Sequence, residues 1–301
     1  SVRQNEAAIR SQRAFVQYAE INLLVRAALA FIGGKRDREV LALRRKNLAF
    51  LEEQVRAANA RLSVGEGTRT DVAQARAERA AAQAQIAAAL SAVRVSEASY
   101  LQEIGSPAPA RLTLNAVPSH LLPNSRSSAR DIAMSRHPVI KANQYAADSS
   151  RFAIKIAEAS FLPTLGVTAA VQREINTAGS GRRAADASIT ATLNIPIYNG
   201  GTRFSQVREA KERLSVSRIN IEGARDEVRL QVDRAWAELE AARASVSANR
   251  AQLEAGQLAL NGVIEERKVG QRTTLDVLNA QREVIDAQIG LAQAQSNQVA
   301  A

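Results

Sequence analysis

The sequence predicts a mainly α-helical protein of long antiparallel coiled-coil helical hairpins with one β-hairpin, and three observations lead to this prediction. All seven prolines lie in residues 107–196, so the two long flanking stretches contain no helix breaker. In the second flank, apolar residues recur every seven positions, as in a coiled-coil seam: Val232, Leu239, Val246, Leu253 and Leu260. The chain also repeats, because a shift of 205 residues aligns residues 1–96 with residues 206–301.

Composition narrows the class of protein. Of the 301 residues, 59 are alanine and only 4% are aromatic, which favours long packed helices over a globular core of large side chains. The lack of cysteine excludes a disulfide scaffold, and two histidines are too few for a histidine-rich zinc site. No run of about 18 apolar residues occurs, so the sequence predicts no transmembrane helix.

Each repeat contains a short turn between two predicted helices. The turns read Val64-Gly65-Glu66-Gly67-Thr68 and Val269-Gly270-Gln271-Arg272-Thr273. Glycine ends the incoming helix and can adopt the left-handed conformation there. A threonine then caps the outgoing helix, and the candidates are Thr68 or Thr70 in the first turn and Thr273 or Thr274 in the second. Asp71 and Asp276 fall in the positively polarised first turn of those helices, which is a structural reason for both carboxylates.

The central segment changes to an alternating pattern. Residues 164–172 and 188–197 alternate small or polar side chains with apolar ones, as strands do. One face of the second strand carries Ile189, Ala191, Leu193, Ile195 and Ile197, and the other carries Ser188, Thr190, Thr192 and Asn194. Both segments have the length of a tilted membrane-spanning strand, and two such strands need partners from other chains to close a barrel. The alternative is a small two-stranded hairpin that lies on a helix.

Three motifs resemble the TolC-type outer-membrane efflux proteins, the exit ducts of Gram-negative pumps and type I secretion systems. Two of them flank the strands: Phe161-Leu162-Pro163-Thr164-Leu165 and Leu193-Asn194-Ile195-Pro196-Ile197-Tyr198-Asn199-Gly200-Gly201. The third is the pair of turns at 64–72 and 269–280, which look like the family's two periplasmic hairpin tips. The motifs fall in the family's order, and the resemblance covers nearly the whole chain.

The resemblance implies a passive duct and not an enzyme, with no cofactor, no metal and no nucleic acid. The protein would be a homotrimer, with a twelve-stranded transmembrane β-barrel in the outer membrane of a Gram-negative bacterium and a periplasmic α-barrel tunnel of twelve long helices. Its partners would be a periplasmic adaptor (membrane fusion) protein, an inner-membrane pump and outer-membrane lipid. This chain holds two strands where the family has four, so its first repeat is expected to be N-terminally incomplete.

The repeat and the resemblance together divide the chain into five expected segments. They are a helical hairpin at 1–104, a linker or equatorial segment at 105–130, a helix at 131–161, a transmembrane β-hairpin at 162–198 and a long helical hairpin at 199–301. The first helix of the last segment is predicted from Thr202 to about Arg267.

By the same resemblance, three sets of residues have expected roles. The periplasmic gate would comprise Thr70, Asp71, Arg272, Asp276 and Asn279, with Arg272 linked to Thr70 and Asp71 on the neighbouring hairpin. Asp276 would ring the constriction, and Asn279 stands where the best-known members have a second carboxylate. The adaptor would dock at the tips, formed by Val64, Gly65, Glu66, Val269, Gly270 and Gln271. Ile189, Leu193 and Ile197 would face lipid.

A second function is compatible with the net charge of +10, which arises from 40 Lys and Arg against 30 Asp and Glu. A soluble basic coiled-coil scaffold that binds protein or nucleic acid would share this composition. The paired strands separate the two, because such a scaffold has no use for strands of membrane length. No catalytic constellation is evident: His137 stands alone before Pro138, and Gly65-Glu66-Gly67 lacks both the strand and the lysine of a phosphate loop.

Overall fold

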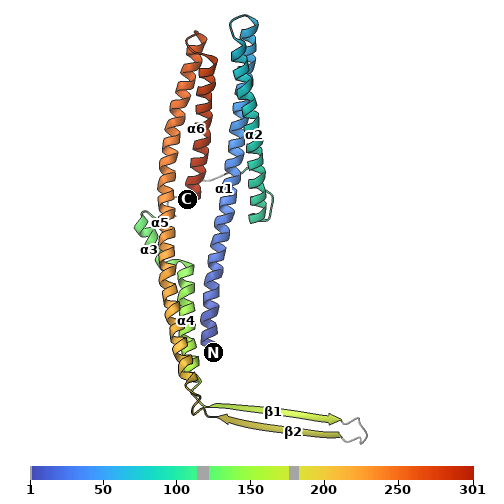
Figure 1. Cartoon of the computed structure of the whole chain (residues 1–301), viewed down its shortest axis with the longest axis vertical. Coiled ribbons are helices and arrows are strands. Elements are labelled where there is room, and N and C mark those ends of the chain that lie inside the picture. The colour runs from blue at the N-terminus through green and yellow to red at the C-terminus, as the bar shows by residue number, and fades with distance from the viewer. Residues whose placement is uncertain (1, 114–121, 176–182) are drawn as a thin grey trace. The chain divides into compact units, whose positions relative to one another are not determined.

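The structure is a computed structural model that describes residues 2–113, 122–175 and 183–301. These residues form six helices and two strands (Figure 1). In chain order they are α1 (Val2–Ser63), α2 (Arg69–Ile104), α3 (Arg126–Arg136), α4 (Pro138–Ala159), β1 (Thr164–Ile175), β2 (Arg183–Asn194), α5 (Thr202–Lys268) and α6 (Thr274–Ala300). The prediction of a mainly helical fold with one small sheet is confirmed, and the helix expected from Thr202 to about Arg267 ends one residue later.

The chain divides into two compact units. One comprises Ser1–Tyr18 and Met134–Val228, and the other comprises Ala19–Ala133 and Arg229–Ala301. The first unit therefore holds α4 and both strands, and the second holds α2 and α6. The long helices α1 and α5 contribute residues to both units.

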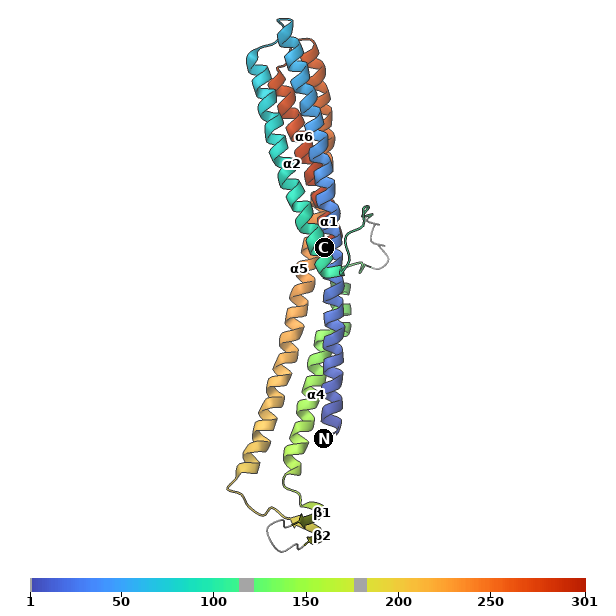
Figure 2. The same cartoon turned by 90° about the vertical axis from the view of Figure 1, so that its right-hand side faces the viewer.

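In the second unit, α1 pairs with α2 in one antiparallel hairpin and α5 pairs with α6 in another (Figures 1 and 2). Small and branched apolar side chains fill the first hairpin: Leu51, Val55, Ala58, Val72, Ala75 and Ala82. The second hairpin buries Leu260, Val277 and Val284. Leu278 of α6 reaches into the first core and Phe50 of α1 lies against both, so the two hairpins pack on each other.

Both tips reverse the chain with the same hydrogen bonds. Gly65 and Gly270 adopt left-handed conformations, with φ of 83° and 81°. The amides of Gly65 and Glu66 donate back to the carbonyls of Leu62 and Arg61 at 3.2 and 2.9 Å. The second tip repeats this pattern from Gly270 and Gln271. This is a Schellman motif, which satisfies the last carbonyls of the incoming helix and requires a residue that tolerates positive φ.

A capping box starts the outgoing helix at each tip and decides between the candidate threonines. The hydroxyls of Thr68 and Thr273 accept the amides of Asp71 and Asp276 at 3.1 and 3.2 Å. In return, each carboxylate accepts its threonine's amide, at 3.1 and 2.9 Å. Thr68 and Thr273 are therefore the N-caps, and both aspartates occupy the third helical position of a capping box.

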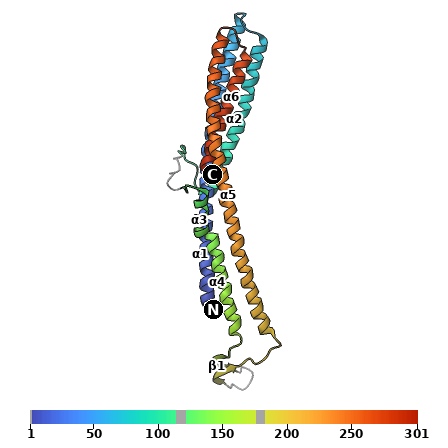
Figure 3. The same ribbon diagram turned by 90° about the vertical axis from the view of Figure 1, so that its left-hand side faces the viewer.

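In the first unit, α4 packs on the first turns of α1 through small side chains (Figure 3). Ala7, Ala14 and Ala142 are buried there, and the Ser11 hydroxyl donates to the carbonyl of Ala142 at 2.9 Å. Such a bond from a short side chain to the backbone of another helix requires close helix axes, which alanine and serine permit.

One expected segment differs in detail. The sequence predicts a single helix over 131–161, and the structure instead has α3 and α4, divided before Pro138. Proline has no amide to donate and disfavours a helical residue before it. Nδ1 of His137 accepts the amide of Val139 at 3.3 Å, so His137 caps α4. The helix α3 begins at Arg126, inside the expected linker, and Arg126 pairs with Asp233 of α5 at 2.8 Å.

The sequence-based prediction that the chain contains no transmembrane helix has to be corrected for α1. Among the described residues, α1 contains a stretch long and apolar enough to cross a membrane by length and composition. The apolar region from Phe15 to Gly34 holds two charged residues, Glu20 and Arg26, so it is not an uninterrupted apolar run. One such helix is weak evidence for a membrane span.

Candidate functional site

The β-hairpin has one apolar face and one mainly polar face, because its register places like side chains opposite each other. Residues directly opposite in an antiparallel pair share a face. The apolar face consists of the pairs Leu165↔Leu193, Val167↔Ala191, Ala169↔Ile189 and Val171↔Ala187. The other face consists of Thr164↔Asn194, Gly166↔Thr192, Thr168↔Thr190, Ala170↔Ser188 and Gln172↔Asp186. The alternating patterns predicted for residues 164–172 and 188–197 are therefore in register with each other.

Neither face is covered by the described part of the chain. Val171 is 84% exposed, Ile189 81% and Leu193 60%. Every strand side chain whose burial is described, at residues 164–173 and 185–194, is exposed. The alternative of a hairpin lying on a helix is thus wrong for these residues. A contiguous apolar face of this kind requires lipid or other protein to cover it.

Ile197 lies outside the strand predicted to contain it. β2 ends at Asn194, which pairs with Thr164, and the 94% exposed Ile197 belongs to the segment before α5. The next position of the partner strand is Pro163, which cannot donate to the ladder, and Pro196 removes a donor from the second chain segment. Pairing therefore stops before Ile197.

The two hairpin tips meet around one cleft of the second unit. The first hairpin lines it with Ala58, Arg61, Glu66, Gly67 and Asp71, and the second with Arg267, Gly270, Arg272, Thr273 and Thr274. Nη1 of Arg267 crosses between the hairpins and donates to Oε1 of Gln54 at 2.8 Å. Burial lowers the pKa of Arg267, the charge of Arg61 lowers it further, and Asp71 opposes both effects. Arg267 is thus a partly buried cation that links the tips.

Asp71 takes part both in the capping box of α2 and in the contacts with the second hairpin. Its pKa lies below the ordinary value of 3.8, chiefly because the Thr68 hydroxyl donates to its carboxylate at 2.6 Å. A hydrogen bond from the side chain of Thr274 and the charge of Arg267 lower the pKa further. Asp71 therefore remains ionised at neutral pH and faces groups of the second hairpin.

Arg272 makes a different contact from the one expected. Its Nε donates to Oε2 of Glu266 at 2.7 Å, within its own hairpin, and not to Thr70 or Asp71. The Schellman turn folds Arg272 back beside the last turn of α5, where Glu266 lies. The carboxylate of Asp71 instead interacts with the hydroxyl of Thr68 and the charge of Arg267. Thr70 is exposed in the first turn of α2. In a single chain, the Arg272 link to the other hairpin is therefore absent from the described contacts.

Asp276 and Asn279 lie on one face at the start of α6. They are three residues apart, so their side chains are neighbours on the helix surface. The Thr273 amide, and next its hydroxyl, lower the pKa of Asp276 below its ordinary value. Asn279 is exposed. This face thus carries one stable negative charge beside a neutral amide.

The tips also present exposed apolar side chains. Val64 and Val269, which precede the two glycines, are 69% and 70% exposed. The positive φ of Gly65 and Gly270 explains these glycines by the turn alone, without a binding role. The valines have no comparable structural explanation within the described residues.

Sequence reasoning missed Arg267. The 205-residue repeat aligns Arg267 with Leu62. An arginine in one copy where the other has an apolar leucine was a sequence difference that could have marked this position. Its contacts with Gln54 and Asp71 depend on how the hairpins pack, which periodicity alone does not show.

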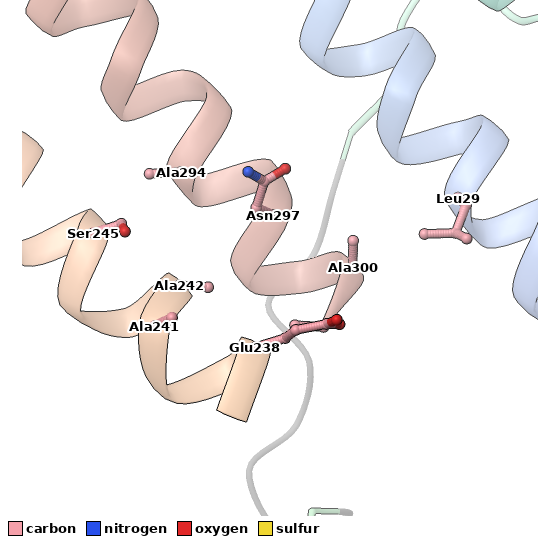
Figure 4. A pocket seen from close by; sticks show the side chains of 9 residues that line it. Leu29, Glu238, Ala241, Ala242, Ser245, Ala294, Asn297 and Ala300 are labelled. Carbon is pink, nitrogen blue, oxygen red and sulfur yellow. The ribbon is translucent and has the colours of Figure 1, made fainter. Parts of the chain in front are cut away.

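No feature of the described residues supports catalysis or metal binding. No group of three or more His, Cys, Asp or Glu lies close enough to hold a metal ion in the part of the chain that the structure describes. A cleft beside the end of α6 (Figure 4) is lined by Leu29, Glu238, Ala241, Ala242, Ser245, Ala294, Asn297, Ala300 and Ala301. Neither histidine nor lysine lines it.

The chain belongs to the outer membrane efflux protein family, whose model matches residues 129–301. The resemblance noted in the sequence is thereby confirmed. The chain is 48% identical over 297 residues to outer membrane efflux protein BepC of Brucella suis, covering 98% of this chain and 65% of BepC. It is 26% identical over 284 residues to alkaline protease secretion protein AprF of Pseudomonas aeruginosa, covering 90% of this chain and 58% of AprF. The chain therefore spans less than two thirds of these curated relatives.

Solved structures share the fold. A membrane protein from Pseudomonas aeruginosa superposes with a TM-score of 0.84 at 20% identity, covering 99% of this chain and 70% of that one. The outer membrane protein VceC from Vibrio cholerae gives 0.78 at 18% identity, with 99% and 72% covered.

The two strand faces are expected to differ sharply in their tolerance of charge. In the full-length protein, Leu193→Arg places a guanidinium on the apolar face and should cost roughly 2–4 kcal/mol if that face lies at mid-membrane. Thr192→Arg, its neighbour on the opposite face, is the matched control and should assemble normally. The amount of assembled protein in outer-membrane fractions measures both. Equal yields would contradict the assignment of the faces.

Proposed function

We propose that this chain is part of an outer-membrane channel-tunnel, the passive exit duct of a tripartite efflux pump or a type I secretion system. The observation that carries the proposal is an uncovered apolar face of membrane-spanning length on a β-hairpin. The names of BepC and AprF, one an efflux protein and one a secretion protein, agree with a duct in the outer membrane of a Gram-negative bacterium. The basic scaffold is disfavoured, because an exposed apolar sheet face is a liability in water.

The strands favour a homotrimer. A two-stranded hairpin cannot satisfy its outer backbone edges in lipid, so it has to join a closed barrel. Four strands from each of three subunits would make twelve, and β1 and β2 would supply two of each four. Long helices of the three subunits would continue as a periplasmic α-barrel tunnel, and the apolar face with Ile189 and Leu193 would contact lipid.

The hairpin tips would form the periplasmic gate. Threefold symmetry would bring three copies of Asp276 together on the axis, where like charges repel and attract cations. Asn279 would leave this ring with three carboxylates where a second aspartate would give six. Arg272 would exchange Glu266 for Thr70 and Asp71 of a neighbouring hairpin in the closed state. This exchange is inexpensive, since an exposed ion pair contributes about 0–1 kcal/mol.

Single-channel conductance of the full-length protein in planar bilayers tests the duct and its gate together. Arg272→Ser and Asp71→Asn should both conduct more than the parent, because each removes a charge that holds the closed state, while the introduced asparagine can still accept the capping hydrogen bond. Asn279→Asp should be blocked more readily by divalent cations. Arg69→Ser, another exposed tip arginine, is the control and should match the parent. Absence of any channel would contradict the duct, and unchanged conductance in both charge variants would contradict the gate.

A periplasmic adaptor and, through it, an inner-membrane pump would dock at the tips formed by residues 64–66 and 269–271. The exposed valines, and not the glycines, are the informative positions, since replacing Gly65 or Gly270 would strain the turn itself. Val64→Glu with Val269→Glu should reduce co-purification of the adaptor and leave channel conductance unchanged. Val95→Glu, at a 65% exposed valine of α2 away from the tips, should retain the adaptor. Full retention in the tip variant would contradict docking at these residues.

A further inference from the structure

The apolar face of the β-hairpin changes character toward the end of β1. Four pairs of this face, from Leu165↔Leu193 to Val171↔Ala187, consist of leucine, valine, isoleucine and alanine. The next pair on the same face is Arg173↔Ala185, because side chains of one face recur at every second residue. Arg173 and Ala185 are both exposed. A single guanidinium therefore follows directly on a run of apolar side chains.

Arg173 has no carboxylate beside it on this face of the described strands. The residue opposite it is Ala185, and the preceding residue of the face on β1 is Val171, which is 84% exposed. Asp186 belongs to the other face, where it pairs with Gln172. Because an alanine side chain ends at Cβ, it does not cover the guanidinium, and a ligand from outside the hairpin can reach it.

The opposite end of the apolar face, next to the helices, carries aromatic side chains. Phe161 precedes β1 and Phe204 follows β2, and their ring centroids lie 5.0 Å apart. Aromatic girdles flank the apolar band of membrane β-barrels at both interfaces. The aromatic pair therefore indicates that the membrane boundary on the helix side lies close to the first apolar pair, Leu165↔Leu193.

The length of the apolar face indicates the depth of Arg173 in such a membrane. Between positions 165 and 173 the strand extends about 26 Å, at a rise of about 3.3 Å per residue. Strands of membrane barrels are tilted by about 35–45°, so this length covers about 20 Å of depth, and their apolar band is about 25 Å tall. Arg173 therefore falls close to the far boundary of the hydrocarbon, on the side away from the helices.

A guanidinium at this depth favours a phosphate ligand. The cost of a lipid-facing charge falls steeply from mid-membrane to the interface, and the long arginine side chain can extend its charge toward the headgroups. Lipid phosphates are the anions at that level of a bilayer. The planar guanidinium can donate two parallel hydrogen bonds to one phosphate, which a neutral headgroup does not match in charge.

We propose that Arg173 binds the phosphate of an anionic lipid at the outer boundary of the membrane. The site is open on the same face as Val171 and Ile189, so its ligand comes from the lipid that covers this face and not from phosphate in solution. The inference rests on the proposed function, because it requires the apolar face to lie in the outer membrane. Each chain of the assembly would carry one such site.

Native mass spectrometry of the full-length protein in detergent, with phosphatidylglycerol added, measures the affinity for an anionic lipid. Arg173→Gln should lower this affinity about fivefold, since one exposed ionic contact is lost. Arg173→Lys should lower it less, because lysine keeps the charge but cannot donate in the bidentate geometry. Monogalactosyl diacylglycerol with the same acyl chains has no phosphate, and it should bind the parent and both variants alike.

The matched control exchanges two neighbours, Arg173→Gln with Gln172→Arg. It keeps the net charge and moves the guanidinium to the other face at the same level, so it should bind phosphatidylglycerol as weakly as Arg173→Gln alone. All variants are compared as assembled protein, which separates loss of the site from loss of assembly.

Equal affinity of the parent and Arg173→Gln for phosphatidylglycerol would overturn the proposal, because a protein carboxylate or water would then satisfy the guanidinium. Full binding by the exchanged variant would overturn it too, since the face would not matter. Displacement of the lipid by inorganic phosphate would contradict a lipid ligand. These results leave the duct intact, whereas failure of the duct itself would appear as absent conductance.

Discussion

The left-handed glycine at each hairpin tip is the constraint on which the helical part of this structure depends. Gly65 and Gly270 let two backbone amides turn back onto the carbonyls of the incoming helix, and three residues later a threonine starts the outgoing helix. So short a reversal forces antiparallel packing, which brings the heptad residues of each hairpin face to face. With a β-branched or bulky residue at these positions, the cost of a positive φ would have to be offset by contacts, and the tips are exposed.

The β-hairpin solves a different physical problem. Its twelve pairs use one backbone edge of each strand, and every strand side chain whose burial is described is exposed. Threonine, serine and asparagine on one face suit water, and leucine, isoleucine and valine on the other suit lipid. A hairpin with one polar and one apolar face, followed along the chain by the 67-residue helix α5, is the chemical basis for proposing that the chain is part of a membrane duct.

Local patterns predicted much of this arrangement. Proline positions and the heptad spacing located the long helices, and alternation located both strand faces, because these features follow from backbone geometry. The exact ends of the strands and helices were harder to predict. Ile197 fits the alternation of β2, but pairing stops where Pro163 removes the partner's donor. Thr68 and Thr70 are equally good caps by type, and only the observed capping box with Asp71 identifies Thr68 as the N-cap.

Contacts between hairpins were beyond local patterns. Arg272 lies near the carboxylates of both Glu266 and Asp276, so its ion pair with Glu266 depends on the folded turn. Arg267 donates to Gln54, and Arg282 pairs with Glu78, so each of these contacts joins residues more than 200 positions apart. An internal repeat can indicate such a residue only where the two copies of the repeat carry different side chains, as they do at Leu62 and Arg267.

The central claim is that the apolar face of the β-hairpin lies in lipid within an assembly of identical chains. A cryo-electron microscopy structure of the full-length protein in lipid nanodiscs tests this most directly. The account predicts three copies around one axis, with Ile189 and Leu193 against the acyl chains and Thr190 and Thr192 toward the lumen. A monomer, or a β-hairpin whose apolar face packs on helices outside the bilayer, would contradict it.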